Sequence, residues 1–200
     1  MTARIEQVRA QGDINAWIIG DQDEVIVVDP GPDAVAVLDA VGDREVLAVI
    51  CTHGHHVAAA VDVADRDEAP VALHRQDLIL WRESHPDARP EIEVEDGGIF
   101  EVADATLEVI YVGGHTPGSI CLYCEELGAV FTGHALTADG PVRHDGEFRD
   151  FAAQLTAIGE HLLTLPPSTR VLPGEGEETT VAAAEKKFDS WVTVAQPEAD

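Results

Sequence analysis

The run Val46-Leu-Ala-Val-Ile-Cys51 is apolar at every position and ends directly at Thr52-His53. A strand without polar alternation is typically buried on both faces, so its sheet must be covered on both sides by other layers. This run therefore predicts a layered structure with a buried strand, and it places His53 where that strand ends.

The other segments follow an order that suits two sheets with helices outside them. Two β-branched runs, 16–20 and 25–28, are joined by an acidic turn and predict a hairpin. Residues 97–112 alternate as an antiparallel pair of strands does. Further strands are expected over 70–74, 120–124, 129–132 and 170–174, and helices over 32–41, 57–67, 76–83, 150–165 and 180–192. We expect an α/β fold of the αββα type, with two mixed sheets packed face to face.

The length and composition suit one globular domain. The chain has 200 residues, of which 45% are hydrophobic. We assign 1–194 to a single domain and 195–200 to a polar tail. A chain of this length buries a real core, so it does not need metal or disulfides merely to fold. Any metal site is therefore expected to be functional.

The net charge narrows the expected partners. The chain carries 38 acidic residues against 12 Lys and Arg, a formal net charge of -26. Nucleic acid and anionic membrane both require clustered basic residues, so neither is an expected partner. We expect a small-molecule substrate, and the oligomeric state stays open. No apolar leader follows Met1 and no apolar run reaches the roughly 18 residues of a membrane span, so a cytoplasmic protein is expected.

The three cysteines do not suggest a disulfide framework. Cys121 and Cys124 have a metal-binding spacing, but no second pair of this kind completes a zinc site. Both lie on a predicted strand at positions that face opposite sides. We therefore expect buried structural thiols.

Polar side chains gather in loops that directly follow predicted strands. These loops are 52–56, 114–119, 131–134 and 172–176. Sites are commonly built at such strand ends. His53 and His55 form an H-x-H pair that can place both rings on one ion, with Gly54 allowing the backbone conformation. A third imidazole from His115 leaves an open position for water or substrate, as in catalytic zinc sites.

The loops resemble the motif series of the metallo-β-lactamase fold superfamily, especially its glyoxalase II-like hydrolases. The resemblance is carried by Val28-Asp29-Pro-Gly31, Thr52-His-Gly-His55, Gly114-His-Thr-Pro-Gly-Ser119, Phe131-Thr-Gly133, Leu172-Pro-Gly174 and Gly176-x-x-Thr179. The body of the chain is similar to short, single-domain actinobacterial members. The resemblance implies a metal-dependent hydrolase, with Asp29 as an anchor of the His53 loop rather than a catalyst.

The second metal position of that superfamily is altered in this chain. The usual T-H-x-H-x-D-H motif would place Val57 and Ala58 at its last two ligand positions. With a gap of two residues, His56 becomes the last histidine and the aspartate is absent, and we prefer this alignment. His134 stands where the superfamily has a bridging aspartate, and Glu175 stands where it has a late histidine.

We therefore expect a site retuned for one ion, most simply zinc. The expected metal ligands are His53, His55, His115 and His134. Glu175 and His56 are the expected catalytic residues, Glu175 as a general base or further ligand and His56 as a proton carrier. A hard carboxylate beside several imidazoles would also suit Fe(II) or Mn(II).

The leading hypothesis is a metal-dependent hydrolase that attacks a thioester or related acyl substrate with metal-activated water. Two alternatives stay open: a metal-binding protein without hydrolase activity, and a non-haem iron enzyme that acts on a thiol. Four histidines lie outside the motif loops and are not expected to bind the ion: His74, His85, His144 and His161.

Overall fold

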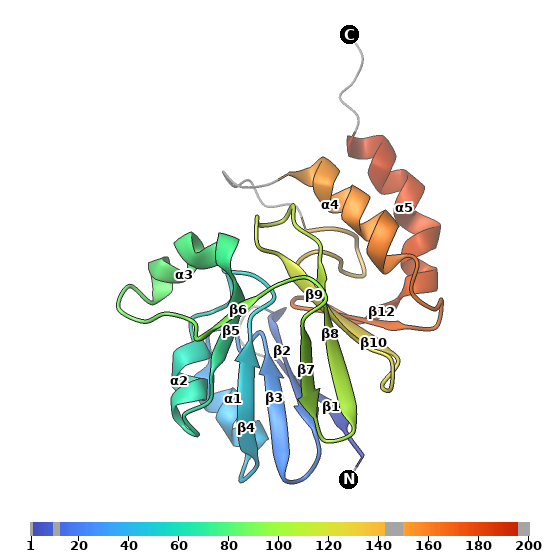
Figure 1. The fold of residues 1–200 in the computed structure, drawn as a ribbon. Helices are drawn as coiled ribbons and strands as arrows, with labels where there is room; N and C mark the ends of the chain where they lie inside the picture. Colours follow the sequence, from blue (N-terminus) through green and yellow to red (C-terminus); the bar gives the residue numbers. More distant parts are fainter. Residues whose placement is uncertain (1, 10–12, 143–149, 196–200) are drawn as a thin grey trace.

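The computed structural model describes residues 2–9, 13–142 and 150–195. Two six-stranded sheets pack face to face, and helices lie on their outer faces (Figure 1). The first sheet has the order β1 (Arg4–Arg9), β2 (Asn15–Gly20), β3 (Glu24–Val28), β4 (Glu45–Ile50), β5 (Val71–His74) and β6 (Ile92–Val94). The second has the order β12 (Thr179–Thr180), β11 (Arg170–Pro173), β10 (Ala129–Gly133), β9 (Ile120–Cys124), β8 (Ala105–Tyr111) and β7 (Ile99–Val102). Both sheets mix parallel and antiparallel pairs, as expected.

The helices cover the two sheets from outside. They are α1 (Ala34–Val41), α2 (Ala60–Asp65), α3 (Leu78–Ser84), α4 (Phe151–Ala157) and α5 (Val181–Ala195). Side chains of α1 and α2 pack with the outer face of the first sheet, and those of α5 pack with the second. In Figure 1, α4 and α5 lie together at the upper right. The αββα prediction is confirmed.

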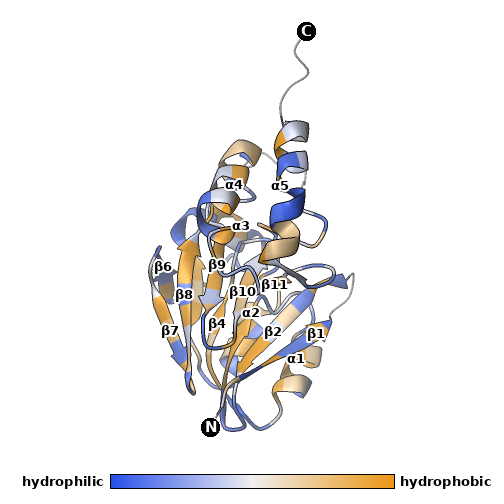
Figure 2. Ribbon diagram, turned by 90° about the vertical axis from the view of Figure 1, so that its right-hand side faces the viewer, coloured by the Kyte–Doolittle hydropathy of each residue, from blue (hydrophilic) through white to orange (hydrophobic). Residues whose placement is uncertain are grey.

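The central strands β2 and β4 carry buried side chains on both faces, which is why they lack polar alternation. In β2, Trp17 and Ile19 point into the core between the sheets, whereas Ala16 and Ile18 point toward α1 and α2. In β4, Ile50 faces the inner core, and Val49 faces the helices. Figure 2 shows this hydrophobic colouring along the central strands. The double burial predicted for residues 46–51 is therefore confirmed.

Some elements differ from the sequence expectations. Strands β1, β6 and β12 were not expected; β1 is an edge strand whose side chains are mostly half-buried or exposed, so it gives little hydrophobic signal. The helix expected over 57–67 is reduced to α2. The helix expected over 150–165 changes after Ala157 into a π-helical turn, Ile158–Leu162.

Three further expectations concern the thiols, the membrane and the tail. Cys124 lies between the sheets and Cys121 lies under the helices, both fully buried and free, as expected. No helix in the described ranges is long and apolar enough to cross a membrane. Helix α5 continues through Ala195, and 196–200 lie outside the described residues, so the boundary at 194 stays a prediction.

Candidate metal centre

The directions of the strands bring the motif loops together at one edge of the molecule. Strands β8 and β10 both pair antiparallel with β9, and β11 pairs parallel with β10. Since β8, β10 and β11 therefore point the same way, the loops that carry His115, His134 and Glu175 emerge at the same end. The backbone N–H of Ile120 donates to the carbonyl oxygen of Thr52 at 2.9 Å, which joins this edge to the His53 loop of the other sheet.

Five imidazole rings gather where these loops meet, and His53 is at their centre. Its ring centroid lies 5.5 Å from that of His55, 5.1 Å from His56, 5.2 Å from His115 and 4.7 Å from His134. The structure thus brings together all four of the expected metal ligands and adds His56 to them. His55 is exposed and His56 half-buried, whereas the other three rings are buried.

The ring nitrogens form two overlapping sets of three. One set is His53, His55 and His115, the other is His53, His56 and His134, and in each set one nitrogen per ring lies within 4.8 Å of the others. Nε2 of His115 is 3.2 Å from Nδ1 of His55 and 3.3 Å from Nδ1 of His134. His115 and His134 therefore also connect the two sets.

A hydrogen-bonded chain fixes the proton of His53. The hydroxyl of Thr52 donates to Oδ2 of Asp29 at 2.6 Å, and its oxygen lies 3.0 Å from Nδ1 of His53. Because the only hydroxyl proton is directed to Asp29, the Thr52 oxygen accepts from Nδ1–H of His53. The lone pair of His53 is then on Nε2. The structure thus agrees with the expected anchoring role of Asp29, which acts through Thr52.

The electrostatics of His53 suit a cation. Nε2 of His53 is buried and has no hydrogen-bond partner. Burial, followed by the neighbouring imidazole of His134, holds the pKa of His53 well below its ordinary value, so the ring is neutral near pH 7. Burial also raises the pKa of Asp29 to about 6 against the opposing effect of its bonds from Thr52, which leaves a carboxylate at neutral pH. A metal ligand requires a neutral nitrogen whose lone pair accepts no hydrogen bond, and Nε2 of His53 meets this condition.

Asp77 joins the loop that carries His53 and His55 to the loop that carries His115, a role that the sequence did not predict. Its carboxylate is fully buried and accepts from N–H of Gly54 at 2.8 Å, the hydroxyl of Thr116 at 2.6 Å and N–H of Gly118 at 2.7 Å. These donors lie beside His55 and on both sides of Pro117. One side chain thus holds both loops of the first set, although it lies outside every sequence motif.

Close approach explains two glycines of the loops. A Cβ on Gly133 would lie 2.1 Å from the hydroxyl oxygen of Thr52, and Gly133 also has a φ of +50°. A Cβ on Gly54 would lie 2.5 Å from Cβ of Leu80. Gly54 has no left-handed φ, so lack of space, rather than the backbone conformation expected from the sequence, requires a glycine there.

Gln154 of α4 supports the loops from the helical side and was also missed. Its amide nitrogen donates to the carbonyl oxygens of His134 and Ala135 at 3.3 and 3.0 Å. Its Cβ and backbone lie so close to Gly114 that no side chain would fit there. Gln154 carried no sequence signal because a single polar residue on a helix has no diagnostic spacing.

Glu175 lies at the rim of the cluster and not within either set of three. Its carboxylate is 45% exposed, and Oε2 lies 3.4 Å from Nε2 of His134. The sets themselves contain only imidazole nitrogens, which suit zinc, copper, nickel and iron. Neither set contains the hard carboxylate ligand that would favour Mn(II).

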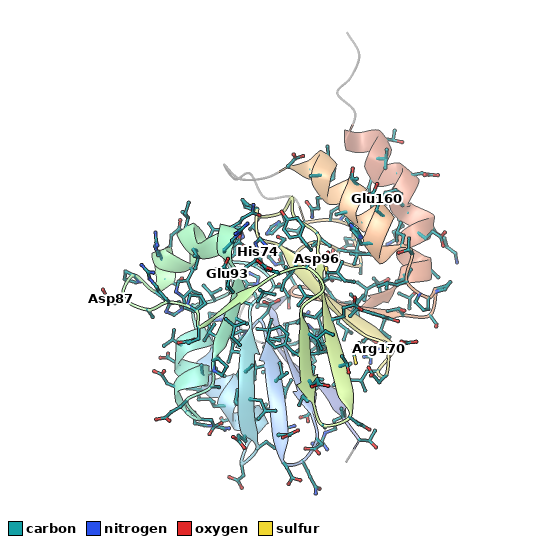
Figure 3. The ribbon with its side chains drawn as sticks, viewed as in Figure 1. His74, Asp87, Glu93, Asp96, Glu160 and Arg170 are labelled. Atoms are coloured by element: carbon teal, nitrogen blue, oxygen red, sulfur yellow. The ribbon has the colours of Figure 1, made fainter. Side chains whose placement is uncertain are left out.

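The histidines not expected to bind the ion lie elsewhere in the described chain. His74, labelled in Figure 3, ends β5 and packs against the ring of Tyr111. His85 packs on Trp81, with its Nε2 2.8 Å from the carbonyl oxygen of Val57. His161 is exposed on the π-helical turn. His144 lies outside the described residues.

Known proteins share this sequence pattern and this fold. The sequence model of the Metallo-beta-lactamase superfamily matches residues 9–175. The probable metallo-hydrolase YqgX of Bacillus subtilis is 30% identical over 183 residues, covering 84% of this chain and 87% of that protein. The hydroxyacylglutathione hydrolase GloC of Haemophilus influenzae is 25% identical over 178 residues, covering 80% and 84%.

A solved structure extends the likeness to the whole fold. The crystal structure of TTHA1623 in a di-iron-bound form superposes with a TM-score of 0.80 at 27% identity, covering 90% of this chain and 97% of that one. The match of the family model, the relatives and the fold agree with the motif loops that form the histidine cluster. The chain belongs to the metallo-beta-lactamase superfamily, and five of its histidines gather at a candidate metal site.

Proposed function

We propose that this protein is a metal-dependent hydrolase that binds one ion per chain and acts on a thioester or related acyl substrate. One observation carries the proposal: imidazoles from three loops converge on the buried, unpartnered Nε2 of His53. Membership in a superfamily that includes metallo-hydrolases supports hydrolysis. The relative named a hydroxyacylglutathione hydrolase supports a thioester.

The proton of His53 supports a single ion. Nδ1 of His53 donates to Thr52, so only the lone pair of Nε2 remains for a metal. Both candidate sets need that same lone pair. Two ions therefore cannot occupy the two sets at once, and the sets describe alternative positions for one ion. We assign its binding to His53, His55 and His115, with His134 as the fourth ligand.

The chain's own residues supply positioning and proton transfer. When bound, an ion of this kind polarises an acyl carbonyl and activates water near neutral pH. Asp29 and Asp77 hold the loops that orient His53, His55 and His115. His56 is half-buried and its ring centroid is 4.4 Å from that of His134. We assign His56 the transfer of protons between the site and solvent.

A reconstituted protein tests the proposal directly. Zinc-loaded protein is assayed against a panel of thioesters, esters and lactones, with and without a chelator. We expect turnover of at least one thioester that is abolished by the chelator and by His115→Ala. His161→Ala is the matched control, because that exposed imidazole lies outside the cluster, and it should retain full activity. Activity that survives chelation or His115→Ala would contradict the proposal.

A metal-binding protein without hydrolase activity is the second candidate. It is favoured by the position of His134, whose Nδ1 lies 3.3 Å from Nε2 of His115, against 3.2 Å for Nδ1 of His55. Four imidazoles around a tetrahedral zinc ion would leave no open position, as in structural sites, whereas the proposed hydrolase requires the ion to accept water or substrate as a fifth ligand. A folded, zinc-loaded protein that is inert toward the whole panel would support this candidate.

A further inference from the structure

The two residues that depart from the superfamily's ligand pattern at the late positions contact each other. His134 replaces the expected aspartate and Glu175 replaces the expected histidine. In the structure, Nε2 of His134 and Oε2 of Glu175 are 3.4 Å apart. Relative to the expected pattern, the histidine stands at the position of the acidic residue and the acidic residue at the position of the histidine. Because the two side chains are in contact, we treat the two replacements as one pair.

The two nitrogens of His134 face different partners. Nδ1 points toward the first set and lies 3.3 Å from Nε2 of His115, while Nε2 faces Glu175. Two nitrogens that share one tetrahedral zinc ion, with bonds of about 2.0–2.1 Å, lie roughly 3.3 Å apart. The spacing of His55 and His115, 3.2 Å, has the same value. Nδ1 of His134 is thus at ligand spacing from one nitrogen of the first set, that of His115, although His134 also belongs to the set with His53 and His56.

The backbone, rather than flexible side chains, brings the pair together. N–H of Gly174 donates to the carbonyl oxygen of Gly133 at 2.8 Å, one residue before each member of the pair. N–H of Asn15 donates to the carbonyl oxygen of Gly174 at 2.8 Å and fixes the Glu175 loop from the other sheet. His134 is buried, with only 2% of its side chain exposed. The ring therefore cannot turn away without disturbing two loops.

A neutral imidazole has one N–H and one lone pair, so the position of its proton decides which nitrogen can bind metal. A carboxylate beside Nε2 favours the proton there and leaves the lone pair on Nδ1. The geometry points to Glu175 as a positioning residue that keeps the proton of His134 on Nε2 and so makes Nδ1 the fourth ligand. This inference rests on the proposed metal centre, but not on hydrolase activity.

A double-mutant cycle on metal affinity tests the pairing. Cobalt(II) and zinc(II) affinities are measured by chelator competition for the wild type, Glu175→Gln, His134→Ala and the double variant. We expect Glu175→Gln to weaken binding about 10–100-fold, which is the usual effect of removing such a partner. His134→Ala should weaken binding at least as much, and the double variant should match His134→Ala alone. If the alanine variant does not fold, His134→Gln takes its place in the cycle.

Glu178→Gln is the matched control. Glu178 pairs with Arg170, labelled in Figure 3, at 2.6 Å on the surface, and both side chains are about half exposed. Its removal should leave cobalt affinity unchanged. The visible spectrum of bound cobalt should shift in Glu175→Gln toward that of the His134 variant, which a purely structural role of Glu175 would not cause.

Two results would overturn the inference: unchanged affinity in Glu175→Gln, or additive losses in the double variant. Neither measurement needs turnover. An inert protein that shows the expected cycle would contradict the proposed hydrolase and leave the role of Glu175 intact. Conversely, an active hydrolase with unchanged affinity in Glu175→Gln would contradict only the role of Glu175.

Discussion

The metal centre has two halves that are supported in different ways. The primary half is His53, His55 and His115. The secondary half is His56 and His134 with their neighbour Glu175. In the primary half, two buried carboxylates accept hydrogen bonds from backbone N–H groups of the loops. Asp29 accepts from Thr52, and Asp77 accepts from Gly54 and Gly118. In the secondary half, the carboxylate of Glu175 is 45% exposed and contacts the imidazole of His134.

This difference separates the carboxylates that support the fold of the site from the carboxylate that affects a single imidazole. A buried carboxylate that accepts several backbone donors is part of the fold, because its loss leaves those donors without partners. An exposed carboxylate beside one ring changes only the properties of that ring. The secondary half can therefore change while the loops of the primary half keep their shape.

The largest effect that distinguishes the halves is on folding. Asp77→Ala removes the acceptor of three buried donors and should lower the free energy of unfolding by about 3–5 kcal/mol. Glu175→Ala should change it by no more than about 0.5 kcal/mol. Urea denaturation of the metal-free proteins measures both values. Equal losses would remove the distinction between the halves.

A smaller effect is expected on metal binding by the ligands themselves. His115→Ala removes a buried member of the primary half, and zinc affinity should fall by more than the roughly 100-fold that outer partners contribute. His56→Ala should have a weaker effect, because this half-buried ring belongs only to the alternative set. Competition with a chromophoric chelator gives both constants. A stronger loss in His56→Ala would mean that the ion occupies the secondary half.

The smallest of these effects tests the support of His53. Thr52→Val keeps the shape of the side chain but removes the acceptor for Nδ1–H of His53 and the donor to Asp29. Zinc affinity should fall about 10–100-fold. Thr52→Ser keeps the hydroxyl and should bind zinc as the wild type does. Loss of affinity in the serine variant would show that packing, not the hydrogen bond, supports His53.

The primary half could be predicted from sequence because its ligands directly follow apolar runs. His53 follows β4, whose last three residues are buried, so its place at the sheet edge depends only on where that strand ends. Its loops also contain glycines that close packing requires, such as Gly54 against Leu80. The edge strand β1 gave no such signal, because its exposed positions lack the apolar pattern.

The rest of the site depends on contacts between segments far apart in the chain. Asp77 lies on a short helical turn, and only the folded chain shows that it joins two loops. Among the three acidic residues near the last motif, Glu177 pairs with Arg9, Glu178 pairs with Arg170, and Glu175 alone contacts the cluster. Local sequence is equally acidic at all three, so the fold decides which of them faces the metal centre.

The number of ions per chain tests the account most directly. The protein is saturated with zinc, dialysed to remove excess, and analysed for metal and protein content by elemental spectrometry. Because both candidate sets share the single lone pair of His53, we predict one ion per chain. Binding of that ion should be lost in His53→Ala. Two ions per chain, or one that persists without His53, would contradict the account.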